Sequence, residues 1–115
     1  MEKAKLSEDI KRSMDLWRKG FEPLPQSYMD FHTELAKKDL EILKSKNIQI
    51  LKEWVADDGW MDGMKVLWAE IRLPNGSYKK IHWHDGNQEF FECQESGASV
   101  PLKVERLVVV SESYK

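Results

Sequence analysis

The sequence predicts an α+β fold, in which an N-terminal pair of helices packs on an antiparallel, meander-like sheet of about five strands. Apolar residues recur with helical spacing before Lys46, and the spacing changes toward alternation after it. Asn75-Gly76 and Asp85-Gly86-Asn87-Gln88 then separate alternating runs, as the turns of β-hairpins do. A more strongly curled sheet, close to a small β-barrel with N-terminal helices, is the alternative.

The length and composition are those of one small domain. The 115 residues divide into a helical part, 1–46, and a sheet part, 47–115. A hydrophobic content of 41% with five tryptophans can form a core without disulfides. The single Cys93 fits a reducing compartment. Because Met1–Lys5 leads into no apolar stretch, we expect a cytoplasmic protein with no signal peptide and no membrane span.

The charges are balanced and well mixed. The chain has 18 basic and 20 acidic side chains, for a net charge of −2. Nucleic-acid binders usually carry a basic excess, because neutralising phosphates supplies most of their affinity. The composition therefore disfavours a nucleic-acid partner.

The first helix has signals at both ends. Ser7 is a good N-cap, and Ile10, Met14 and Trp17 follow on one face. Gly20 is placed to end the helix.

A stiff connector, 21–25, leads into the second helix, which we expect from Gln26 to Lys46. Its apolar stripe consists of Tyr28, Phe31, Leu35 and Ile42. The short proline-containing link suggests a helical hairpin or an L-shaped pair.

Five segments are predicted as strands by alternation and by the turns between them. The first, Ile48–Val55, could also continue the helix. The others are Lys65–Leu73, Tyr78–His84, Glu89–Gln94 and Val100–Val110.

Two-residue loops would fix how these strands pair. A loop at Asn75-Gly76 places Ala69 opposite His82 and Trp68 opposite Trp83. A turn closed by Gly86-Asn87 places two more pairs opposite each other, Glu89 with His84 and Phe91 with His82. The more apolar face should be covered by the helices; it contains Leu67, Ala69, Ile71, Leu73 and Phe91.

The other predicted face is an aromatic patch rimmed by charges, the usual composition of a recognition surface. It contains Trp68, Trp83 and Phe90, with Trp60 of the acidic loop 57–63 at its edge. We interpret the chain as a small non-enzymatic protein-binding module of the inhibitor, immunity or phage-accessory type. Two alternatives are that these rings form a second small core and that a homodimer covers them.

His82, His84 and Glu89 are a candidate metal site. The two histidines lie two residues apart on one strand and therefore project from the same face, with Glu89 across the turn. Two imidazoles and a carboxylate can bind a divalent metal with open positions for water or substrate, which would favour a metal-dependent enzyme. The structural alternative is that the histidines cap the rim of the core. No other cofactor is expected, because no nucleophilic catalytic set and no phosphate loop is recognisable.

The same stretch resembles the first motif of the cupin family. The matching residues are Gly76, His82, His84, Glu89 and Gly97, and the last is one residue late. The resemblance implies metal binding by the two histidines and the glutamate. The chain departs from the family because no histidine follows His84, as the second cupin motif requires. Its sheet part is also short for the double-stranded β-helix of cupins.

Overall fold

A computed structural model describes residues 4–59, 61, 63–94 and 97–102. Two helices come first, α1 (Glu8–Arg18) and α2 (Gln26–Ser45). Five strands follow: β1 (Gln49–Asp57), β2 (Lys65–Arg72), β3 (Tyr78–His84), β4 (Glu89–Cys93) and β5 (Ser99–Pro101). The part of the predicted last strand beyond Leu102 lies outside the described residues.

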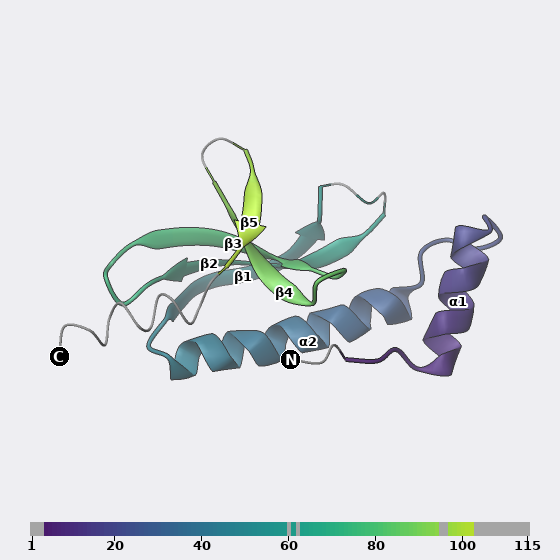
Figure 1. The fold of residues 1–115 in the computed structure, drawn as a ribbon, viewed down its shortest axis with the longest axis horizontal. Helices are drawn as coiled ribbons and strands as arrows, with labels where there is room; N and C mark the ends of the chain where they lie inside the picture. The colour runs from purple at the N-terminus through teal and green to yellow at the C-terminus, as the bar shows by residue number, and fades with distance from the viewer. Residues whose placement is uncertain (1–3, 60, 62, 95–96, 103–115) are drawn as a thin grey trace.

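The molecule has two layers, a sheet and a helix beneath it (Figure 1). The strands follow one another in the order β1-β2-β3-β4-β5, and each pair is antiparallel. Helix α2 contacts β1, β2 and β4, and α1 contacts α2. The predicted α+β fold with a five-stranded meander is confirmed. The sheet of the described residues is open, so within them there is neither the small barrel nor the double-stranded β-helix implied by the cupin resemblance. No described helix has the length and apolarity to cross a bilayer.

The helices end where their local sequence predicts. The Ser7 side chain accepts a hydrogen bond from the backbone N–H of Ile10 at 3.3 Å. Gly20, with φ of +81°, ends α1. Asn47, with φ of +63°, plays the same part after α2, and the N–H of Ile48 donates to the carbonyl of Leu43 at 3.1 Å. This left-handed residue stops the helix, so the segment after it forms a strand and does not continue α2.

The first hairpin has a three-residue loop, and the predicted two-residue loop is wrong. The N–H of Gly76 donates to Leu73 at 2.9 Å, and the N–H of Leu73 donates to Ser77 at 2.8 Å. Proline explains the difference. A two-residue loop would pair Pro74 with Ser77, where a backbone N–H is needed that proline lacks. Pro74 instead takes a turn position that suits its fixed φ, and Gly76 adopts φ of +88°.

The longer loop shifts the β2–β3 pairing by one residue. Trp68 lies opposite His82 and Ala69 opposite Ile81, so the predicted partners Trp68–Trp83 and Ala69–His82 are wrong. A shift of one residue moves every side chain of a strand to the other face relative to its neighbour. The predicted β3–β4 pairing, with His84 opposite Glu89, is confirmed.

The side chains on the face toward α2 are therefore not all the ones that were predicted. The predicted buried side chains of β2, and of Leu73 just after it, do lie on this face: Leu67, Ala69, Ile71 and Leu73. Trp83 and Phe90 join them, with exposures of 2% and 4%. Phe91, which was expected in this core, lies on the opposite face beside His82.

A hydrogen bond links the sheet to α2 inside the core. The indole Nε1–H of Trp83 donates to Nδ1 of His32 at 3.1 Å, and both side chains are buried. The neighbouring hydroxyl of Tyr28 donates to Asp85 at 2.6 Å. Burial lowers the pKa of His32, and the charge of Asp85 offsets part of this effect. His32 is therefore a neutral acceptor, as the bond to Trp83 requires.

Replacing His32 should destabilise the protein through this bond. In a His32→Ala variant the buried indole N–H of Trp83 loses its acceptor and a cavity opens, at a combined cost of about 2–4 kcal/mol. His32→Asn places an amide oxygen near the former Nδ1 and should lose less than half of that. Urea unfolding followed by tryptophan fluorescence measures both losses. Equal losses in the two variants would contradict the assigned role of the bond.

Stability should also fall as the pH drops below about 6.5. The pKa values of buried His32 and His82 are both lowered from 6.5, chiefly by desolvation. Below pH 6.5 these histidines therefore take up protons in the unfolded chain more readily than in the folded chain. The free energy of unfolding thus has its full value above pH 6.5 and decreases below it, by up to about 1.4 kcal/mol per pH unit for each histidine. Urea titrations between pH 7 and pH 5 should give a smaller slope in His32→Asn than in the wild type. An unchanged slope would mean that His32 does not contribute to the pH dependence of stability.

Candidate functional site

The candidate site is the face of the sheet that points away from α2, which we call the open face. Among the described residues, neither helix covers it (Figure 1). One row of side chains crosses this face from β1 to β5, each directly opposite the next. It consists of Trp54, Trp68, His82, Phe91 and Pro101, and we call it the aromatic row.

The rings of the row lie against one another. Trp54 and Trp68 are nearly parallel, at 15°, with centroids 6.2 Å apart. Trp68 and His82 follow at 4.7 Å, and Phe91 stacks on His84 at 4.4 Å. The two indoles and Phe91 are half-buried, although no helix covers them. Cross-strand contacts between rings stabilise the sheet, and each of these three residues keeps part of its surface accessible.

Lysine side chains flank one side of the aromatic row. The ammonium of Lys52 lies 5.1 Å from the ring centroid of Trp54, and that of Lys80 lies 5.3 Å from Trp68 and 5.9 Å from Trp54. Such cation–π contacts contribute about 0.5–1 kcal/mol each at exposed sites. Glu70 lies between the lysines in the ladder and accepts a hydrogen bond from Tyr78. The open face therefore presents cations beside aromatic rings.

His82 is buried at the centre of the row. Its Nδ1 lies 3.6 Å from Sγ of Cys93. Burial lowers the pKa of His82, and the charge of His84 lowers it further. Burial raises the pKa of the Cys93 thiol, and Lys80 offsets part of this rise. The thiol is thus protonated at neutral pH and is not an activated nucleophile.

The predicted metal ligands are neighbours but do not converge. His82 and His84 share a face, and Glu89 lies opposite His84, as the sequence predicts. Nδ1 of His84 accepts the N–H of Asn87 at 3.0 Å and so helps to close the β3–β4 turn. Within the described ranges, no group of three or more His, Cys, Asp or Glu side chains could hold a metal ion. The geometry thus gives a divalent metal no site here.

The predicted binding residues do not form one surface. Trp68 lies on the open face, but Trp83 and Phe90 are buried against α2, so their predicted place on an exposed patch is wrong. Trp60 lies outside the described residues. Trp54 was missed by sequence reasoning. Its signal was the alternation in Lys52-Glu53-Trp54, which places a lysine and an indole on the same face of an edge strand.

Comparison of the chain with protein-family models, with curated proteins and with solved structures gives no match. The cupin-like spacing around His82 thus receives no support from these comparisons.

Phe90 and Phe91 are adjacent in sequence and lie on opposite faces, so they form a matched pair. Phe90→Ala removes a core side chain and should cost about 3–5 kcal/mol. Phe91→Ala removes a half-buried ring from the open face and should cost about 1–2 kcal/mol. Urea unfolding of the two variants measures the difference. A larger loss for Phe91→Ala than for Phe90→Ala would mean that the two faces are assigned the wrong way round.

Proposed function

We propose that this chain is a non-enzymatic protein-binding module whose recognition surface is the open face of the sheet. The observation that carries the proposal is the aromatic row, which leaves two half-buried indoles and a phenylalanine without a helix above them. Tryptophan is the residue type most enriched among those that dominate binding energy at protein interfaces. The raised thiol pKa of Cys93 and the scattered carboxylates give no comparable support to an enzyme.

The arrangement of the rings favours a protein over a single-stranded nucleic acid. Bases stack on aromatic faces that are available to them. Here the faces of Trp54 and Trp68 are already engaged, by each other and by the ammonium groups of Lys52 and Lys80. The net charge of −2 also lacks the basic excess that phosphate binding uses.

The charges next to the aromatic row indicate the chemistry of the partner. Lys52 and Lys80 are exposed on the open face, and Arg72 lies on the same side, opposite Tyr78. Glu70 is the acidic side chain between them, and it is engaged by the Tyr78 hydroxyl. A protein segment that combines apolar side chains with carboxylates would cover the rings and pair with these cations.

The wider assignment follows from the same features. A chain of 115 residues with a half-buried aromatic face that no described helix covers, and with no recognisable catalytic set, fits the inhibitor, immunity or phage-accessory type of protein. Its one cysteine fits the reducing conditions of the cytoplasm.

Affinity capture from a lysate of the source organism, followed by calorimetry with the purified partner, tests the proposal. Trp68→Ala should weaken binding by about thirtyfold or more, as expected of a central interface tryptophan. Lys80→Glu should weaken it by about tenfold and reduce its dependence on salt, because a cation beside the row is replaced by an anion. The matched control is Phe21→Ala, which removes a 74% exposed ring in the α1–α2 connector. It should leave binding unchanged.

Several outcomes would contradict the proposal. A partner that binds Trp68→Ala and the wild type equally does not use the open face. A nucleic acid recovered in place of a protein would assign the face to a different class of ligand. Self-association lost in Trp68→Ala would mean that a second copy occupies the open face.

A further inference from the structure

Strand β1 forms one edge of the sheet. Among the described strands it is the longest, with nine residues, and it pairs only with β2. Leu51 and Val55 on this strand are 39% and 52% exposed. A long edge strand with exposed apolar side chains is a template for pairing with another strand.

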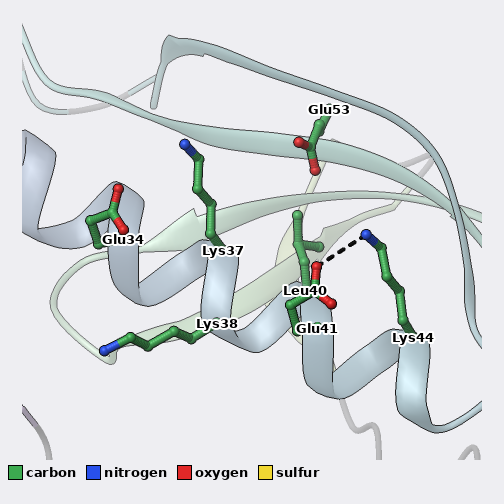
Figure 2. Close-up of a pocket in the computed structure, with 7 residues that line it drawn as sticks. All are labelled: Glu34, Lys37, Lys38, Leu40, Glu41, Lys44 and Glu53. Carbon is green, nitrogen blue, oxygen red and sulfur yellow. Dashed lines mark hydrogen bonds and ion pairs between the residues drawn. The ribbon is translucent and has the colours of Figure 1, made fainter.

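A groove of about 350 Å³ runs between β1 and α2 (Figure 2). Its wall on α2 consists mainly of charged side chains, and Glu53 extends into it from β1. The residues that line it are Glu34, Lys37, Lys38, Leu40, Glu41, Lys44 and Glu53.

The charges on this face of α2 form a pattern that is complementary to itself. Glu34, Lys37, Glu41 and Lys44 follow at intervals of three, four and three residues, which keeps them on one side of the helix. When two copies of this face meet antiparallel about a two-fold axis, Glu34 faces Lys44 of the other copy and Lys37 faces its Glu41. All four contacts then join opposite charges. Of the four residues, only Glu41 and Lys44 form an ion pair within the described chain, at 3.1 Å.

The same two-fold axis would also bring two copies of the edge strand β1 together in antiparallel pairing. The midpoint of the four charged residues is position 39, and Glu53, which lines the same groove, is the neighbour of Trp54 near the middle of β1. The register shift between Ile50 and Lys52 leaves the regular part of β1 at Lys52–Asp57. Self-pairing centred on Trp54 uses this regular part, with Lys52 opposite Ala56 of the other copy. It also avoids placing Glu53 opposite itself, which would be destabilising.

We propose that β1 and the charged face of α2 form the interface of a homodimer. Two β1 strands pair antiparallel, so the two five-stranded sheets become one continuous sheet. The α2 helices lie on the same side of that sheet, and their long Glu and Lys side chains bridge the gap between them. This interface uses the backbone edge of β1 and the helix side of the sheet, whereas the open face is on the other side. The two surfaces meet at Trp54 and Lys52, whose side chains belong to the open face.

Two double variants with opposite charge test the interface. Lys37→Glu with Lys44→Glu makes the helix face entirely acidic, and Glu34→Lys with Glu41→Lys makes it entirely basic. All four positions are exposed, so both variants should keep the fold, which circular dichroism and urea unfolding check. Sedimentation velocity of the full chain should show a concentration-dependent dimer for the wild type and a monomer for each variant. An equimolar mixture of the two variants should restore the dimer.

The opposite results overturn the proposal. A wild type that sediments as a monomer at every concentration has no such interface. A dimer that persists in both double variants, or a mixture that stays monomeric, means that these four charges do not meet across a two-fold axis. The open face is tested independently, because the monomeric variants keep Trp68 and Lys80 and should still bind the protein partner.

Discussion

The backbone of Pro74 decides which side chains of β3 face the helix. Proline cannot donate the hydrogen bond that a two-residue loop needs next to Asn75-Gly76, so the chain turns one residue earlier and Leu73 pairs with Ser77. Because side chains alternate along a strand, this single residue exchanges the indole of Trp83 with the imidazole of His82. This one-residue shift decides which side chains lie in the core and which lie on the proposed recognition surface.

Helix α2 carries polar side chains that form hydrogen bonds with the residues of the face that this register buries. A buried indole needs an acceptor for its N–H, and His32 supplies one from the first half of the helix. The hydroxyl of Tyr28, one turn earlier, meets Asp85 at the end of β3. The two hydrogen bonds fix where the helix lies along the sheet, which apolar packing alone specifies less sharply. His82, on the opposite face, is enclosed by rings that its own sheet provides.

Local signals predicted much of the fold. Ser7 and Gly20 control the ends of α1 through their own side-chain and backbone preferences, which do not depend on distant residues. The β3–β4 pairing follows from its turn in the same way. The first hairpin was wrong because two local rules compete there, and the missing N–H of Pro74 outweighs the tendency of Asn75-Gly76 to form a two-residue loop.

The candidate site was harder to predict because it depends on contacts between strands. Trp54 becomes part of a surface only through its place opposite Trp68, and no feature of its own segment specifies that pairing. The burial of Trp83 likewise requires the acceptor of His32, which lies 51 residues earlier in the chain. Residue type identified the aromatic side chains, whereas the face each one occupies was set by the tertiary structure.

The strand order has a consequence for how the chain reaches this structure. Every strand pairs with its neighbour in sequence, so the ladders close over short loops and carry a small entropic cost of closure. Pairing between neighbouring strands shortens the sequence separation of the contacting residues, which is associated with faster folding than pairing between distant strands. The long-range step is the docking of α2, in which His32 meets Trp83. A transition state with the meander largely assembled, and the helix joining late, is the route that this connectivity favours.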